Sequence, residues 1–323
     1  MTLSRRSLMA AGIAALAAGS ASAQGARPVR LVVPLAPGGG LDAIGRQLAL
    51  SMAPALASTV IVENKPGASG TLAMEFTARA SVEQPTMVLA MGSTVGIVPH
   101  FMRQLGYDSV RDFAPVAQVG LTPFVLVVAA DHPARTLAQF VAHTRGKPKA
   151  TSFGSYGNGT SSHIVGAAFN QAAGIDLLHV PYKGSALALN DLIGGQVTAV
   201  VADFGSAGQH LGPNGRVRAL AVTGAKRSPG YPDVPTFGEQ GYAALDNVVG
   251  WVGLFAPAAT PRATVEQWAQ AATAAVGGDA VKERLLQLGY VPTGTPTRAF
   301  AAIVQQERER WGEIIRSTGV TVE

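Results

Sequence analysis

A glycine-rich run, Pro37-Gly38-Gly39-Gly40-Leu41-Asp42-Ala43, follows an apolar strand and opens a helical pattern. Glycine lets a ligand approach the backbone closely, and the first turn of a helix offers unpaired N–H groups at the positive end of its dipole. Such a turn binds an anion without a cationic side chain. An ordinary strand-to-helix turn in which Asp42 has a capping role explains the same pattern, so both readings stay open for this run taken alone.

The same run fits the dinucleotide-binding fingerprint, with Gly38, Gly40 and Ala43 at its small-residue positions. Glu63 ends the next expected strand 20 residues after Ala43, where an acceptor for a ribose hydroxyl belongs. The prolines at positions 34 and 37, an export signal and the lack of a recognisable catalytic acid or base weigh against this alternative. An exported dinucleotide-binding oxidoreductase that uses this loop is therefore the second hypothesis.

A second run of the same kind, Gly154-Ser155-Tyr156-Gly157-Asn158-Gly159-Thr160-Ser161-Ser162-His163, also lies between an expected strand and an expected helix. Small hydroxyl residues at a helix start offer O–H and N–H donors to one carboxylate. Taken alone, an N-cap with a flexible loop explains the run equally well. Two anion-receptive helix starts together favour a clamp that holds either both ends of a small dicarboxylate or one end of a longer acid.

Signatures of catalysis and metal binding are scarce. The sequence has no Gly-x-Ser-x-Gly elbow, no Walker A loop and no His-Glu-x-x-His helix. It has no cysteine, which excludes thiolate nucleophiles, cysteine-ligated zinc, iron–sulfur clusters and disulfides. The six histidines lack metal-ligand spacing, and His163 could shape the second run but has no neighbouring acid for a triad. We expect no metal, no cofactor and no catalytic residue.

Strands and helices that alternate along the chain must position these two runs. Strands are expected at 29–33, 60–63 and 87–91. One helix is expected at 41–56 and a second after the turn at 64–70, ending near residue 79, and this βαβαβ order requires a parallel sheet. A second series predicts strands at 124–129, 151–153, 177–180, 197–202 and 217–222, with helices at 136–145, 161–172 and 185–193. After a run at 251–256, helices at 261–276, 279–288 and 296–316 extend almost to the end.

This order predicts an α/β fold of two doubly wound domains, residues 24–122 plus 249–323 and residues 123–248. Segments near 120–125 and 245–252 cross between them, so a ligand cleft is expected between the domains. The 323 residues suffice for two cores. Charged residues are only 14% of the chain, which excludes disorder. The net charge of +5 falls to +3 when residues 1–23, with two arginines and no acid, are removed, and this excess is too small to indicate nucleic-acid or membrane binding.

Residues 1–23 have the pattern of a cleaved signal peptide. Arg5 and Arg6 precede an apolar run at 8–18, and Ala21-Ser22-Ala23 is a small-residue cleavage site. The two arginines also fit a twin-arginine signal, so both export routes stay open. No later apolar run reaches the roughly 18 residues of a transmembrane helix. We expect a soluble periplasmic protein that begins near Gln24.

Several short motifs are spread over nearly the whole mature chain, and together their order and spacing resemble those of one known protein family. They are Val32-Val33-Pro34, Pro37-Gly38-Gly39-Gly40, Val62-Glu63-Asn64-Lys65-Pro66-Gly67, Gly157-Asn158-Gly159-Thr160-Ser161-Ser162-His163, His179-Val180-Pro181-Tyr182-Lys183-Gly184, Gly194-Gly195-Gln196-Val197, Arg218-Ala219-Leu220-Ala221-Val222-Thr223 and Val234-Pro235-Thr236. The chain thereby resembles the Bug family, the extracytoplasmic solute receptors of tripartite tricarboxylate transporters. The resemblance implies a periplasmic-binding-protein type II (Venus flytrap) architecture and a carboxylated ligand held by backbone amides, hydroxyls and bridging waters.

The resemblance also implies ligand-binding positions. The first binding loop corresponds to Gly38, Gly39 and Gly40, and the second to Thr160 and Ser161. A small-hydroxyl loop after the third strand corresponds to Ser93 and Thr94, and an acidic strand end corresponds to Asp203. Leu41 belongs to the same site but stands where the family commonly has Thr or Ser. Leu35 stands where the family often has Phe, and Val82-Glu83-Gln84-Pro85-Thr86 replaces its usual Asp-Gly-Tyr turn. These departures bear on the identity of the ligand.

The sequence therefore predicts a receptor and not an enzyme. It captures a small organic acid in the interdomain cleft and presents it to the permease subunits of a tripartite tricarboxylate-type transporter. We expect a monomer that does not bind nucleic acid or insert into the membrane.

Overall fold

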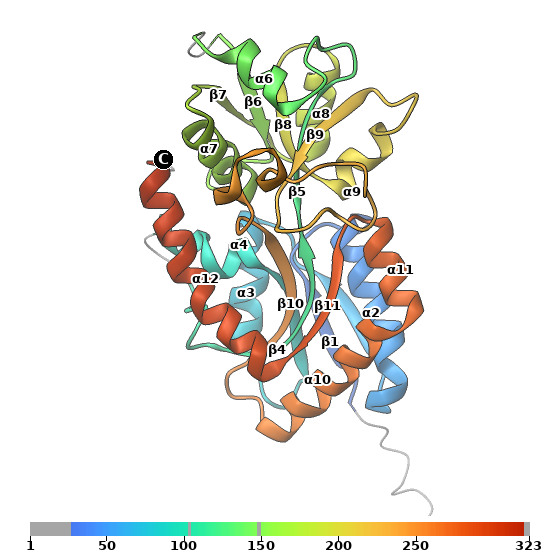
Figure 1. Ribbon diagram of the computed structural model, residues 1–323. Coiled ribbons are helices and arrows are strands. Elements are labelled where there is room, and N and C mark those ends of the chain that lie inside the picture. The colour runs from blue at the N-terminus through green and yellow to red at the C-terminus, as the bar shows by residue number, and fades with distance from the viewer. Residues whose placement is uncertain (1–26, 103–104, 147–149, 320–323) are drawn as a thin grey trace, which may run out of the picture.

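The computed structural model describes residues 27–102, 105–146 and 150–319. The chain forms two α/β lobes stacked end to end, each built around its own mixed sheet (Figure 1). The predicted α/β class with two doubly wound units of the periplasmic-binding-protein type is confirmed. The expected signal peptide lies outside the described residues. Within the described ranges, no helix has the length and apolar character needed to cross a membrane.

The first lobe is built on a six-stranded sheet. Its strands, in spatial order, are β11 (Val291–Pro296), β4 (Phe113–Thr122), β10 (Gly250–Pro257), β3 (Thr86–Met91), β1 (Val29–Val33) and β2 (Val60–Asn64). Its helices are α2 (Gly40–Leu56), α3 (Thr71–Ala78), α4 (Gly92–Gly96), α5 (Val98–Phe101), α10 (Arg262–Gly277), α11 (Asp279–Gln287) and α12 (Thr297–Thr318). The predicted parallel arrangement of β1, β2 and β3 is correct, whereas β10, β4 and β11 run antiparallel to their neighbours.

The inner strands β10 and β3 are almost entirely apolar and buried, because helices cover both faces of the sheet. Leu31 and Val33 of β1 pack into one cluster with residues of α2 and α10, and Val32 packs into a second cluster on the other face. The carboxyl end of β1 thus leads directly to the first glycine-rich run and the start of α2.

The second lobe is built on a five-stranded sheet. Its strands, in spatial order, are β7 (Leu178–Pro181), β6 (Ser152–Ser155), β8 (Ala199–Asp203), β5 (Phe124–Ala129) and β9 (Val217–Val222). Its helices are α6 (Leu137–Thr144), α7 (Ser161–Ala173), α8 (Ser185–Ile193) and α9 (Phe204–Ala207). β6 runs parallel to β7 and β8, and β5 is antiparallel to β8 and β9. Here, too, strand ends lead to helix starts at one edge of the sheet.

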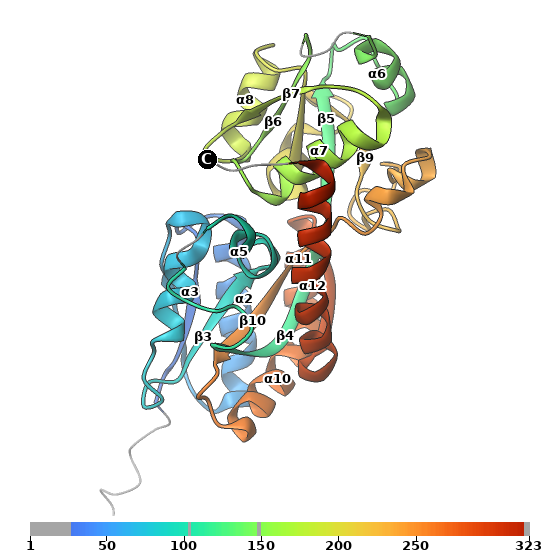
Figure 2. The same cartoon turned by 90° about the vertical axis from the view of Figure 1, so that its left-hand side faces the viewer.

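The chain passes between the lobes at β4–β5, where only Pro123 separates the strands, and returns between β9 and β10. A third connection was not predicted: α12 starts beside the first sheet and runs alongside α7 of the second lobe (Figure 2). Its Trp311 and Ile315 belong to the second lobe's hydrophobic cluster, and Gln171 donates to the Ser317 carbonyl. A helix therefore packs against both lobes in addition to the two chain crossings.

The three helices predicted near the C-terminus are confirmed as α10, α11 and α12, but residues 291–296, between the last two, form β11, which was not predicted. This strand contains two prolines and a glycine and shows no apolar alternation. It is an edge strand, so its prolines lie where one side of the backbone needs no partner. β4 was also not predicted as a strand. β11 pairs only with residues 117–121 of β4, so Pro115 of β4 lies outside the pairing between these two strands.

Candidate functional site

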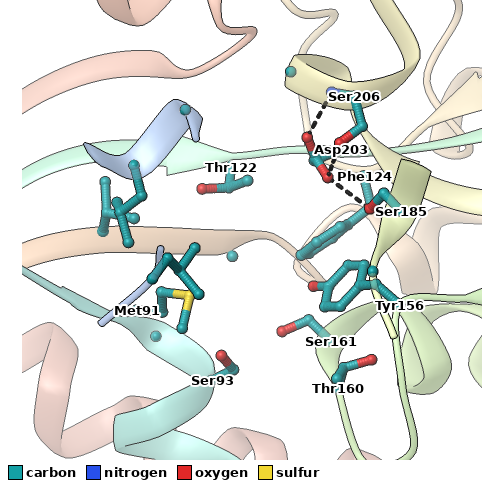
Figure 3. Close-up of a pocket in the computed structure, with 18 of the residues that line it drawn as sticks. Met91, Ser93, Thr122, Phe124, Tyr156, Thr160, Ser161, Ser185, Asp203 and Ser206 are labelled. Carbon is teal, nitrogen blue, oxygen red and sulfur yellow. Dashed lines mark hydrogen bonds between the residues drawn. The ribbon is translucent and has the colours of Figure 1, made fainter. Parts of the chain in front are cut away.

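A pocket of about 480 Å³ lies between the lobes, at the edge where several strands lead to helix starts. Six of the predicted site residues line it: Gly40, Leu41 and Ser93 from the first lobe, and Thr160, Ser161 and Asp203 from the second. Figure 3 shows Met91 and Ser93 on one side of the pocket, with Thr160, Ser161 and Asp203 on the other. Gly38, Gly39 and Thr94 are not among the lining residues.

The first binding loop, residues 37–41, is organised by Asp42. The buried Asp42 carboxylate accepts hydrogen bonds from the Gly38 amide, the Arg46 guanidinium and the Asn64 side chain, each at 2.9 Å. Burial alone would raise the pKa of Asp42, but these hydrogen bonds and the charge of Arg46 lower it below its usual range. The start of α2 therefore already holds a carboxylate of its own chain.

Gly38 has a φ of +86°, in the left-handed region that favours glycine. Its amide donates to the Asp42 carboxylate, and the residue does not line the pocket. Gly40 and Leu41, at the first two positions of α2, are the parts of the run that reach the pocket. The first loop thus presents backbone and an apolar side chain to a ligand.

The second binding loop, residues 157–161, is organised by hydroxyl groups. The Thr160 hydroxyl donates to the Gly157 carbonyl at 2.6 Å, and the Ser162 hydroxyl accepts from the Tyr156 amide at 3.1 Å. Gly157 has a φ of +143°, which favours glycine at this turn. The loop therefore reaches the pocket with Thr160 and Ser161 and without any charged group of its own.

Two stacked histidines lie behind this loop. The rings of His163 and His179 are 3.6 Å apart and nearly parallel. His163 Nδ1 accepts from the Gly159 amide at 3.2 Å, and His179 Nε2 is 2.7 Å from the Ser155 hydroxyl. Burial lowers the pKa of His163 to about 4, and burial together with the neighbouring His163 lowers the pKa of His179 to about 4. The pair supports the loop and does not line the pocket.

Asp203 ends β8 and caps α9. Its carboxylate accepts from the Ser206 amide at 2.8 Å, the Ser185 hydroxyl at 2.9 Å and the Ser206 hydroxyl at 3.2 Å (Figure 3). Ser185 and Ser206 also line the pocket, although no sequence motif predicted them as site residues. This end of the second lobe's wall is therefore rich in acceptors for a donor group on a ligand.

Tyr156 and Tyr290 add two phenols to the lining. Burial raises the pKa of both, and the Asp203 charge raises it further. Both therefore remain protonated at neutral pH and can donate hydrogen bonds. Tyr290 follows α11 in the first lobe, a region in which the sequence showed no binding motif.

The small-hydroxyl loop after β3 divides between two roles. Ser93 lines the pocket, whereas Thr94 is 1% exposed and donates to the Ser69 carbonyl at 3.2 Å. Gly92 is needed beside them, because a Cβ there would lie 2.9 Å from the Trp251 indole. Thr94 thus holds the loop in place while Ser93 reaches the cleft.

Lys183 is the one cationic residue among those lining the pocket. It lies in the turn between β7 and α8, within a run that carries the family resemblance but was not predicted to bind a ligand. Across the described residues, none of the ion pairs within 4.0 Å includes its ammonium group. The same part of the chain contains no cluster of His, Asp and Glu suited to a metal.

A sequence model described as the tripartite tricarboxylate transporter family receptor matches residues 44–320. The chain belongs to this family. It is 37% identical over 290 residues to the UPF0065 protein in the tcbD-tcbE intergenic region of Pseudomonas sp. (strain P51), covering 90% of this chain and 85% of that protein. The predicted Bug-family resemblance is likewise confirmed by relatives and structures that carry the Bug name.

Two solved structures show how the family fold matches this receptor. The periplasmic binding protein BugD superposes with a TM-score of 0.80 at 34% identity, over 92% of this chain and 99% of BugD. R. palustris Rpa4515, solved with adipate, superposes with a TM-score of 0.83 at 28% identity, over 91% of this chain and 98% of that chain.

Glu63, the ribose acceptor of the dinucleotide hypothesis, is paired with Arg30 at 3.0 Å and Lys65 at 2.8 Å and does not line the pocket.

Proposed function

We propose that this receptor is a periplasmic protein that captures a small carboxylate between its lobes and delivers it to the permease subunits of a tripartite tricarboxylate transporter. The observation that carries the proposal is a pocket lined from both lobes, with Thr160 and Ser161 at the start of α7 facing the first lobe (Figure 3). The family membership and the adipate-bound relative support a carboxylate as ligand.

The lining suits binding better than catalysis. Ser161 and Ser93 supply hydroxyls, but no histidine is among the described lining residues to act as their base. The tyrosines hold their protons at neutral pH because burial raises their pKa. Neutral donors that stabilise an anion without exchanging protons are appropriate for a carrier, so we propose that the protein is not an enzyme.

Delivery requires that a ligand change the relation of the lobes. A ligand that contacts Ser93 in one lobe and Ser161 in the other favours the closed state only through simultaneous contacts. Pro123 and residues 245–249, which connect the lobes, are the proposed hinge. We propose residues 24–122 plus 249–323 and residues 123–248 as the moving units, with α12 maintaining contact between them.

A ligand panel monitored by thermal shift, calorimetry and X-ray scattering tests this function. We expect at least one organic acid to stabilise the protein, by about 2.7 kcal/mol at 100 times its dissociation constant, and to reduce the radius of gyration. NAD should do neither. Binding of NAD without binding of any organic acid would overturn the receptor function, and a tight acid that leaves the scattering profile unchanged would contradict closure between lobes.

Export is part of the same proposal. The signal peptide expected at residues 1–23 would release a mature, monomeric receptor beginning at or near Gln24. Mass spectrometry of the protein isolated from its native cells should find this terminus in the periplasmic fraction. An intact Met1 in the cytoplasmic fraction would contradict export.

A further inference from the structure

The two walls of the pocket differ in chemistry. Side chains from the first lobe include Leu35, Leu41, Met91, Val252 and Leu288. The second lobe contributes the hydroxyls of Thr160, Ser161, Ser185 and Ser206, the charged side chains of Lys183 and Asp203, and the aromatic rings of Phe124 and Tyr156. The first wall also has hydroxyls, from Ser69, Ser93, Thr122 and Tyr290, so it is mixed but carries no charged side chain. One wall can desolvate an apolar body, and the other can hold a polar head.

Charge restricts how many carboxylates this pocket can hold. Lys183 and Asp203 are the charged residues that line it, and their formal charges cancel. The first binding loop supplies no compensating cation, because the nearby Arg46 is paired with Asp42 and does not line the pocket. A second ligand carboxylate against the first wall would lose water without meeting a cation. A single carboxylate avoids this cost.

The head group has one favourable place on the second wall. Asp203 repels an anion, so a carboxylate is directed toward Thr160 and Ser161. Lys183 lies near them, because its neighbour Tyr182 packs close to Gly157 and Thr160. A Cβ placed on Gly157 would lie 3.6 Å from the Tyr182 carbonyl oxygen and 3.3 Å from Thr160 Cγ2. The residue before Lys183 therefore packs on the loop that carries Thr160. A flexible ammonium group there can reach an anion at the start of α7.

We propose that this receptor selects monocarboxylates with an apolar alkyl or aryl body over dicarboxylates of the same length. The carboxylate is held by Thr160, Ser161 and Lys183, and the body lies against Leu35, Leu41 and Leu288. This inference rests on the proposed receptor function and specifies its substrate class. It assigns Lys183 a role in recognising the head group and Leu41 a role in excluding a second one.

Hexanoate and adipate are a matched pair for the test, because both have six carbons and only one end differs. Calorimetry on the mature chain at constant ionic strength should give at least tenfold tighter binding for hexanoate. Benzoate and terephthalate should show the same order. Tighter binding of adipate and terephthalate would overturn the inference while leaving the receptor function intact. If no acid in a panel that also includes malate binds, the receptor function itself fails, and the inference fails with it.

Variants locate the selectivity. Leu41→Thr should reduce the preference for hexanoate over adipate at least threefold, because the threonine hydroxyl supplies a donor on the first wall. If the buried Leu41 does not tolerate replacement, Leu35→Thr should change the preference in the same direction. Leu72→Thr is the matched control, because Leu72 is 49% exposed and does not line the pocket. Lys183→Ala should weaken hexanoate and benzoate at least fivefold. An unchanged preference in both leucine variants, or unchanged affinity in Lys183→Ala, would contradict the assigned contacts.

Discussion

The loops that open α2 and α7 share one sequence pattern, a glycine-rich turn between a strand and a helix, but their polar groups are satisfied differently. In the first loop, the Asp42 carboxylate accepts from the Gly38 amide and is paired with Arg46. In the second, Thr160 donates within the loop, and the imidazole of His163 accepts from Gly159. The first loop is organised by an anion from its own helix, whereas the second is organised by neutral groups.

This difference shows why a glycine pattern alone does not define an anion site. A helix N-terminus attracts negative charge, but a carboxylate from its own first turn satisfies that preference as well as a ligand does. The second loop lacks such a carboxylate and lines the pocket with hydroxyls. Substitutions that exchange these properties between the loops should therefore affect binding and stability in different proportions.

Giving the second loop a carboxylate should produce the largest effect. Ser161→Asp places a negative charge where we propose that the ligand carboxylate binds, so affinity should fall at least 100-fold, or about 2.8 kcal/mol. Calorimetry with the tightest acid from the panel measures this loss. Ser81→Asp is the matched control at an exposed turn where Ser81 accepts from the Glu83 amide, as aspartate also can. Equal affinity in Ser161→Asp and the wild type would remove the second loop from the site.

Acid should weaken the support of the second loop. The unfolded state binds protons on His163 and His179 near pH 6.5, whereas burial lowers their pKa to about 4 in the folded protein. The stability that they contribute is present above the unfolded pKa and is lost as pH falls toward the folded value. Unfolding free energy should thus drop by roughly 2–3 kcal/mol between pH 7 and pH 5.

Urea denaturation at several pH values measures this slope. His163→Asn should remove part of it while its side-chain oxygen can still accept from the Gly159 amide. His132→Asn is a control of lesser effect, because partial burial and the charge of His143 lower the pKa of His132 and its contacts lie outside the second loop. A pH slope that is the same in His163→Asn as in the wild type would show that the stacked pair does not govern it.

Removing the internal carboxylate of the first loop should have the smaller effect. Asp42→Ala leaves the Gly38 amide without its acceptor and also removes those of Arg46 and Asn64, for a loss of about 2 kcal/mol. Asp42→Asn retains an acceptor and should lose about 1 kcal/mol. Urea denaturation measures both. A greater loss of stability in Asp42→Asn than in Asp42→Ala would contradict the organising role of this carboxylate.

Much of the fold follows from local sequence patterns. The helix predicted at 185–193 and the strands predicted at 124–129 and 217–222 coincide with α8, β5 and β9. These segments have a clear apolar periodicity between turn residues, which determines the local structure regardless of the rest of the chain. β11 could not be found in this way, because its prolines and glycine resemble a loop and its extended form depends on pairing with β4.

The candidate site, like the fold, could be predicted only in part from local sequence patterns. Local patterns identified both glycine loops, since a strand, a turn and a helix start are consecutive in the sequence. They could not show that Asp42 uses Gly38 as a donor, that Thr94 is turned inward to Ser69, or that Tyr290 reaches the pocket.

The sequence by itself determined the alternating elements, the two loops and the family, because each depends on residues close together in the chain or on motifs in a fixed order. Only the tertiary structure decided which groups line the cleft. Leu288 and Tyr290 lie more than 100 residues beyond Lys183 in the sequence, yet all three border one pocket. Their proximity arises from the packing of two lobes, in which burial and hydrogen bonding fix each side chain's direction, and no local periodicity encodes that arrangement.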